Sequence, residues 1–219
     1  MDESTAWISQ AVADQAAAER ERAVVGRWKV PVWCHAVAKY QQAVEKSIKA
    51  IVVALRECGV RGVHPVGYDH RVQNHLRLLR RLPGGGAGRS IQRKLRDFLN
   101  APTRRDIHRL ESLAPRAPVP GEPHTRNTEY PFNDAHGRWT YPAAPDLFLV
   151  EEVNAFQALT RRVAYNAKNF VSALRHGAAA GGNERRVVRG IDPVQREGSH
   201  VRLLGEDPGV PKIRLVGHR

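Results

Sequence analysis

The clearest pattern in the chain is a stripe of apolar residues between Trp33 and Leu55. Apolar side chains recur there at spacings of three and four residues, which places them on one face of a helix. The stripe consists of Trp33, Ala36, Val37, Tyr40, Val44, Ile48, Ile51, Val52 and Leu55. Polar residues occupy the other face, and Glu45 and Lys49 form a favourable i,i+4 pair. The pattern predicts an amphipathic helix that follows Pro31 and ends near Gly59.

A second stripe of the same kind lies near the end of the chain. Its members again alternate steps of four and three, and they are Leu149, Val153, Phe156, Thr160, Val163, Ala167, Phe170 and Leu174. This spacing predicts a long helix with one packing seam. The seam residues are expected to pack in the core of the protein, and a seam of this length could also form a homodimer interface.

Capping residues mark one helix before these two and shorter helices between them. A first helix is expected over residues 4–24 with Ser4 as its N-cap, and a third is expected to begin at Asp69. Ser90 is expected to cap a short helix, and Thr103 with Asp106 resembles a capping box for another. The sequence therefore predicts an all-α fold, a bundle of four to six helices.

Proline and glycine divide the chain into two parts. Seven prolines lie within residues 114–146, which predicts a long crossover loop without regular structure. The bundle is expected to cover residues 1–176, this loop included. Residues 177–219 are expected to form a flexible or partner-ordered arm, with a small hairpin as one possibility because Val201–Leu204 and Ile213–Val216 are β-like.

Several short motifs occur in a fixed order along this bundle. Trp7-Ile8 opens the first helix, and Tyr68-Asp69-His70 leads into the third. A later loop contains Arg126-Asn127-Thr128-Glu129-Tyr130-Pro131. The second helix contributes Ala36, Gln41, Gln42, Ala43, Glu45, Lys46, Lys49 and Ala50.

Together these motifs resemble HEPN domains, which are small helical bundles common in prokaryotic toxin, defence and RNA-processing systems. The resemblance extends from about Ser4 to Ala173. It implies a HEPN-like bundle and a role in a toxin-antitoxin or antiviral defence system. It also implies RNA as a partner, a homodimer, and an antitoxin or nucleotidyltransferase as a further protein partner.

The positive charge of the chain is concentrated in one segment. The formal net charge is +13, and residues 61–109 hold twelve basic residues against three acidic ones. A cationic surface attracts RNA or another polyanion by counterion release. An arginine-rich surface without a ligand is the alternative interpretation. The residues expected to bind nucleic acid are Arg77, Arg80, Arg81, Arg89, Arg93, Lys94, Arg96, Arg104 and Arg105.

Catalysis is a separate question, because the resemblance implies an Arg-x4-6-His motif in active HEPN ribonucleases. Metal-independent RNA cleavage needs a base, an acid and a cation, which histidine and arginine can supply. None of the ten histidines has an arginine at that spacing upstream. Arg126 and Asn127 lie in the loop that resembles the family's, and His136 is the next histidine. These three residues are the first catalytic candidates, and Arg71 with His75 are the second.

Other site chemistry is not expected. The chain contains no phosphate-binding loop motif, no HExxH and no Cys-x2-Cys, so neither a cofactor nor a metal site is predicted. Cys34 and Cys58 lie near opposite ends of one predicted helix, too far apart for a disulfide. The first residues do not resemble a secretory signal, and no apolar run is long enough to span a bilayer, so a soluble cytoplasmic protein is expected.

Two functions follow from these observations. The first is a HEPN-like module that binds RNA, a nucleotide or a protein partner without a standard catalytic motif. The second is a metal-independent endoribonuclease toxin with an unusual Arg/His pair at a homodimer cleft. A structure separates them by showing whether Arg126 from two subunits converges on a histidine within hydrogen-bond reach in a shared cleft, or whether these groups stay apart and face solvent.

Overall fold

The computed structural model describes residues 1–28, 33–63, 70–82, 87–114, 126, 128–129, 132–133, 139–144 and 147–179. In this part of the chain it contains six helices and one pair of very short strands. In chain order these are α1 (Glu3–Trp28), α2 (Cys34–Glu57), α3 (Val72–Arg80), α4 (Ala87–Phe98), α5 (Ala101–Glu111), β1 (Phe132–Asn133), β2 (Trp139–Thr140) and α6 (Val150–Ala179). The expected all-α class is confirmed at this level.

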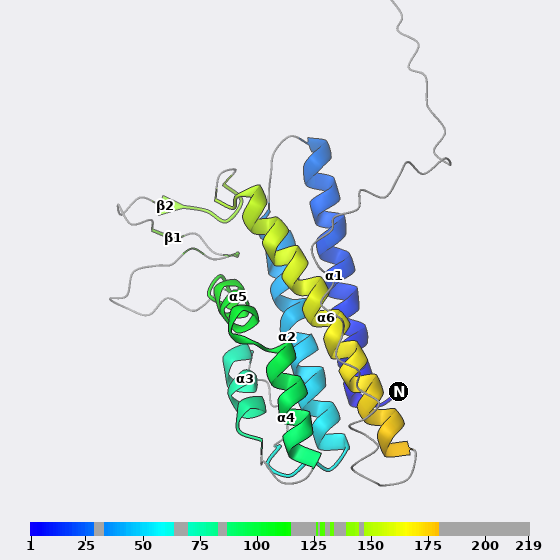
Figure 1. Ribbon diagram of the computed structural model, residues 1–219. Coiled ribbons are helices and arrows are strands. Elements are labelled where there is room, and N and C mark those ends of the chain that lie inside the picture. Colours follow the sequence, from blue (N-terminus) through cyan, green and yellow to red (C-terminus); the bar gives the residue numbers. More distant parts are fainter. Residues whose placement is uncertain are drawn as a thin grey trace, which may run out of the picture.

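Three long helices form the body of the molecule. Helix α2 packs against both α1 and α6, and the short helices α3, α4 and α5 lie together along the other side of α2 (Figure 1). Helix α5 also contacts α6. This arrangement leaves α2 as the central element.

The apolar stripe of α2 explains its central place. Eight of the nine predicted stripe residues are buried, and Trp33 is half-buried. Every residue from Ser47 to Leu55 is buried as well. A helix buried all round must have neighbours on every side, and α1, α3, α5 and α6 supply them.

The predicted seam of α6 is buried with one exception. The side chains from Val153 to Leu174 at the predicted positions are covered, but Leu149 is 63% exposed. Leu149 precedes the first helical residue, Val150, so its side chain does not continue the helical stripe. The helix also runs past the expected boundary at residue 176 to Ala179.

Three of the expected helix starts are wrong by a few residues. Asp2, not Ser4, accepts the amide hydrogen bond of Thr5 at 2.9 Å at the start of α1. Helix α4 begins at Ala87, so Ser90 lies inside it. Helix α5 is capped by Asn100, whose side chain accepts from the Thr103 backbone N at 3.0 Å. Asp69 lies outside the described residues, and α3 begins at Val72.

We expect Asn100→Ala to lower the free energy of unfolding by ~1 kcal/mol, because the Asn100 side chain accepts hydrogen bonds from both the amide and the hydroxyl of Thr103. Urea-induced unfolding followed by circular dichroism measures the change. Asn100→Asp keeps an acceptor at the same place and is the matched control. Equal stability of Asn100→Ala and the parent protein would contradict this assignment.

The proline-rich segment is not wholly irregular, contrary to expectation. Strands β1 and β2 pair antiparallel, with Phe132 opposite Thr140 and Asn133 opposite Trp139. Just before them, the Thr128 backbone N donates to the Leu113 carbonyl at 3.1 Å. The segment is thereby attached to the end of α5. The expected β-like runs of the tail lie outside the described residues.

Lys49 is the most buried charged residue in the described chain, with a side chain that is 2% exposed. Its ammonium lies 2.7 Å from the Glu45 carboxylate and 5.2 Å from the centre of the Trp7 ring. The pair predicted from the spacing is therefore present. Its position beneath a ring of α1 makes it part of the α1–α2 interface.

The start of α1 meets the ends of two other helices in one polar cluster. Ser4 Oγ donates to Glu57 of α2 at 2.5 Å, and Arg175 of α6 donates to Ser4 Oγ at 2.7 Å. Arg175 also pairs with Asp2. These contacts join the beginning and the end of the helical body.

None of the helices in the described chain is both long and apolar enough to cross a membrane. Cys34 and Cys58 are free, in agreement with the expectation that they do not pair. Desolvation by burial raises the pKa of both thiols, so both are protonated at neutral pH. Neither cysteine is therefore suited to act as a nucleophile.

Candidate nucleic-acid interface

Helices α3, α4 and α5 each bury one apolar face and turn arginines outward. Helix α3 buries Val72, Leu76 and Leu79, at spacings of four and three, and exposes Arg77 and Arg80. The amphipathic spacing thus fixes which arginines face solvent.

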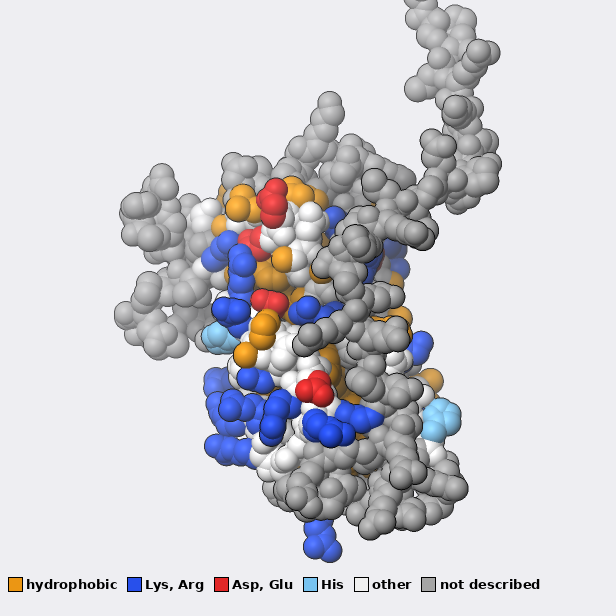
Figure 2. All heavy atoms as spheres, in the orientation of Figure 1, with side chains coloured by type: hydrophobic (Ala, Val, Ile, Leu, Met, Phe, Trp, Pro, Cys, Tyr) orange, Lys and Arg blue, Asp and Glu red, His pale blue; other side chains and the backbone are white. Residues whose placement is uncertain are grey.

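The next two helices repeat this arrangement. Ile91 and Leu95 of α4 are buried while Arg93 and Arg96 are exposed, and α5 buries Ile107 while Arg105 is exposed. In Figure 2 the Lys and Arg side chains gather over the part of the molecule formed by α3 and α4. We call the set Arg77, Arg80, Arg81, Arg93, Arg96, Arg104 and Arg105 the arginine surface.

The charges of the arginine surface are not neutralised within the described part of the chain, where no carboxylate pairs with any of the seven. Two of them bind neutral oxygens: Arg77 contacts the Asn74 side chain at 3.2 Å, and Arg104 donates to the Leu99 carbonyl. Elsewhere in the described residues six arginines do pair with Asp or Glu, namely Arg56, Arg109, Arg126, Arg161, Arg162 and Arg175. The surface therefore holds uncompensated positive charge.

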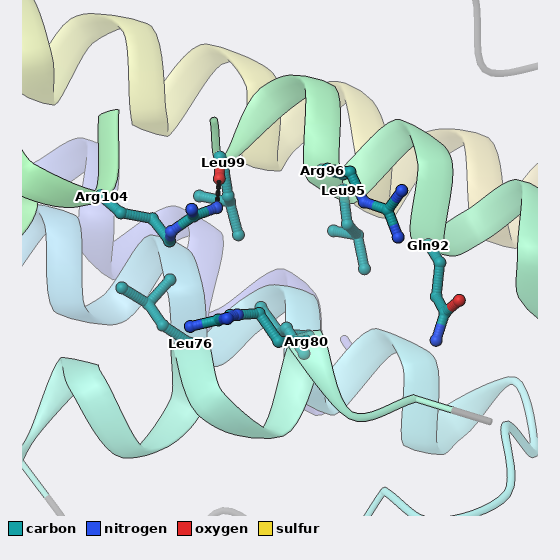
Figure 3. Close-up of a pocket in the computed structure, with 8 residues that line it drawn as sticks. Leu76, Arg80, Gln92, Leu95, Arg96, Leu99 and Arg104 are labelled. Atoms are coloured by element: carbon teal, nitrogen blue, oxygen red, sulfur yellow. Dashed lines mark hydrogen bonds between the residues drawn. The ribbon is translucent and has the colours of Figure 1, made fainter. Parts of the chain in front are cut away.

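A pocket of about 280 Å³ opens within this surface, between α3 and α4 and beside the start of α5. Its apolar lining consists of Leu76, Leu79, Leu95 and Leu99, and its polar lining consists of Arg80, Gln92, Arg96 and Arg104. In Figure 3, Leu95 points from α4 toward α3, Leu99 lies just after the end of α4, and Arg80 and Arg104 approach the end of the pocket near Leu76. The pocket thus combines an apolar lining with three cations.

Two hydrogen bonds hold polar lining residues in place. Arg104 Nη1 donates to the carbonyl of Leu99, just after the last residue of α4, and Gln92 Nε2 donates to the carbonyl of Leu82 (Figure 3 shows the first). A guanidinium has five N–H donors, and the bond to the Leu99 carbonyl uses one of those of Arg104. Its position is set in advance, which reduces the entropy lost when a ligand binds.

The catalytic candidate Arg126 is held by other parts of the protein. It pairs with Glu152 of α6, whose side chain is 8% exposed, and its guanidinium lies 4.4 Å from the centre of the Phe148 ring. Arg109 of α5 approaches the same carboxylate at 2.8 Å. Arg126 therefore helps to attach its segment to α5 and α6. Its proposed companions Asn127 and His136 lie outside the described residues.

The second catalytic pair does not share one exposed face. Arg71 is the N-cap of α3 and lies before the helix, with ψ of 100°, while His75 is inside the helix and 6% exposed. An exposed cap residue and a buried histidine are not arranged as i,i+4 neighbours on one helical surface. The remaining binding candidate Lys94 is half-buried, and the side chain of Arg89 lies outside the described set.

Sequence reasoning identified the arginines of the pocket but not its other lining. The four leucines recur at spacings of three and four residues within each helix, as core residues do, and Gln92 belongs to no motif, so the sequence does not single them out. In the described residues no group of three His, Cys, Asp or Glu side chains could hold a metal ion.

Comparison with protein-family models, curated proteins and solved structures finds no match for this chain.

Proposed function

We propose that this protein binds RNA through the arginine surface, as a HEPN-like module of a prokaryotic toxin-antitoxin or defence system. The observation that supports binding is the set of seven arginines on α3, α4 and α5 without carboxylate partners in the described chain. The family assignment rests on the order of sequence motifs described above. Dimerisation and a protein partner such as an antitoxin or nucleotidyltransferase stay predictions.

Phosphate groups are the ligands that suit this surface best. Guanidinium groups match phosphate oxygens in a bidentate geometry, and binding a polyanion releases its condensed counterions. A protein partner would have to supply carboxylates opposite three separate helices. A polyanion supplies charge at every step along its backbone, so RNA meets the same requirement with one continuous ligand.

Binding is favoured over the alternative, a metal-independent endoribonuclease. In that mechanism an arginine must be available to stabilise charge on the phosphorane. Arg126 already contacts Glu152 and the Phe148 ring, and a phosphate would compete with both. The arginine surface has no such internal competitor among the described carboxylates.

We expect Arg77→Ala combined with Arg105→Ala to weaken RNA binding about tenfold at low salt. The slope of log affinity against log salt concentration should fall by about 1.4, because each lost phosphate contact on a single strand contributes about 0.7. Fluorescence anisotropy with a labelled single-stranded RNA at several salt concentrations measures both values.

The matched control for this experiment removes two exposed basic residues from other helices, Arg20→Ala with Lys168→Ala. It lowers the net charge equally but leaves the arginine surface intact, so both values should stay close to those of the parent. Equal losses in the two double variants would contradict a localised site. Gel analysis of the same RNA tests the alternative: cleavage that disappears in Arg126→Ala with His136→Ala would establish the ribonuclease instead.

A further inference from the structure

Exposed apolar side chains gather at the start of α6. The described chain has seven large hydrophobic residues that are exposed, and four of them lie singly at the chain start, on α1 and on α6. The other three, Tyr141, Leu149 and Val150, fall within ten residues and are 49–63% exposed. Single exposed apolar residues are ordinary, but a group of them marks a contact surface.

A compact connector between β2 and α6 carries these three residues. Two successive turns follow β2, because the Ala144 backbone N donates to the Tyr141 carbonyl at 3.0 Å and the Leu147 backbone N donates to the Ala144 carbonyl at 3.1 Å. In Figure 2 hydrophobic side chains lie beside an acidic one over this end of α6. We call Tyr141, Leu149 and Val150 the apolar patch.

The apolar patch borders a carboxylate that no described cation neutralises. Glu151 is exposed in the first turn of α6 and takes part in none of the ion pairs among the described residues. Its neighbour Glu152, in contrast, pairs with two arginines. A segment that covers this surface should therefore combine apolar side chains with positive charge.

We infer that residues 213–216 of the same chain dock on the apolar patch. This run has three apolar residues and one arginine, and a lysine precedes it: the sequence is Lys212-Ile213-Arg214-Leu215-Val216. The apolar side chains suit the patch, and the two cations suit Glu151. The inference goes beyond the proposed function and does not depend on RNA binding.

Another run of the tail is similar in composition but has the wrong charge beside it. Residues 201–204 are also apolar with one arginine, but Glu206 and Asp207 follow them closely. Those two carboxylates would lie near Glu151 and repel it. Residues 208–219 contain no acidic residue. Charge therefore selects the later run.

The tail is long enough to reach the apolar patch from the opposite end of α6. Helix α6 has 30 residues, so its last residue, Ala179, lies about 45 Å from its start. The 33 residues between Ala179 and Ile213 span up to about 110 Å when extended. A flexible tether that spans its sites gives an effective concentration on the order of 1 mM, so even weak side-chain contacts become populated.

Photocrosslinking from two tyrosine positions tests this docking in the full chain. The photoreactive residue p-benzoylphenylalanine takes the place of Tyr141 in the patch, or of Tyr165, which is on α6 outside the patch and similarly exposed, at 58% against 56%. Peptide mass spectrometry should find crosslinks from position 141 to residues 213–216 and none from position 165. Absence of such crosslinks from position 141, or equal yields from both positions, would overturn the inference.

Matched tail variants test which run docks. Leu215→Asp places a carboxylate in the inferred run, and Leu203→Asp places one in the other run. If the contact is about half populated and Leu215→Asp weakens it about tenfold, the crosslink yield from position 141 falls about fivefold. Leu203→Asp should leave the yield unchanged within about twofold. Equal losses, or a loss with Leu203→Asp alone, would contradict the assignment.

Isotope labelling separates docking within one chain from docking on a second copy. Light and heavy protein are mixed before irradiation, and adducts within one chain carry a single label. Adducts that join the two labels would assign the patch to the tail of a second copy and overturn docking within the chain. Crosslink yield is the suitable measurement, because a contact populated about half of the time changes the free energy of unfolding little.

Discussion

Leu55→Ala should lower the free energy of unfolding by about 3 kcal/mol, within the range of about 2–5 kcal/mol measured for buried leucines. Leu55 is fully buried near the end of α2, and its removal leaves a cavity in the most enclosed part of the core. Urea-induced unfolding followed by circular dichroism gives the change.

The chain offers a matched control for this substitution at Leu149, which belongs to the predicted seam of the last helix but is 63% exposed. We expect Leu149→Ala to change the free energy of unfolding by less than ~0.5 kcal/mol. A large loss at Leu149 would contradict its exposed position. A small loss at Leu55 would contradict the central position of α2.

Lys49→Ala is expected to destabilise the protein by about 3 kcal/mol. It removes a cation from beneath the Trp7 ring and takes its buried ammonium partner from Glu45, whose side chain is only 15% exposed and which keeps the contact with the exposed His70 at 2.9 Å. The aliphatic part of Lys49 also fills space between α1 and α2. Chemical unfolding of the purified variant provides the measurement.

Lys39→Ala is the comparison for this charge removal. Lys39 lies on the same helix, and its side chain is 40% exposed. Its partner Asp14 also pairs with Lys46, so Asp14 keeps one cationic partner when Lys39 is replaced. A loss of at most ~1 kcal/mol is expected there. Lys49→Met with Glu45→Gln should recover much of the stability, since it keeps the side-chain volume and removes both charges of the buried pair. If Lys49→Ala were as mild as Lys39→Ala, the buried pair would not contribute as proposed.

The long helices could be predicted because their signal is local. The stripe of α2 and the seam of α6 are spacings within one segment, and burial follows them closely. Helix starts were less predictable, because several residues near each start can cap. At α5 both Asn100 and Thr103 are suitable caps, and the structure uses the earlier one.

The candidate site was predictable only in part. The arginines could be predicted because charge and amphipathic spacing are visible in the sequence. The same spacing places them on the solvent-exposed faces of their helices. The pocket depends on how far α3 and α4 separate, which no spacing within either helix determines. For the same reason the partner of Arg126 was missed, since Glu152 comes from the start of α6.

The polar cluster of Ser4, Glu57 and Arg175 has a consequence for chain order. It brings the first turn of α1 beside the last turns of α6, so a short linker could join these two ends of the helical body. Such adjacency of ends is the condition under which circular permutation of a domain is usually tolerated. The order in which the six helices follow one another is thus less essential to this bundle than the contacts that α2 makes at its centre.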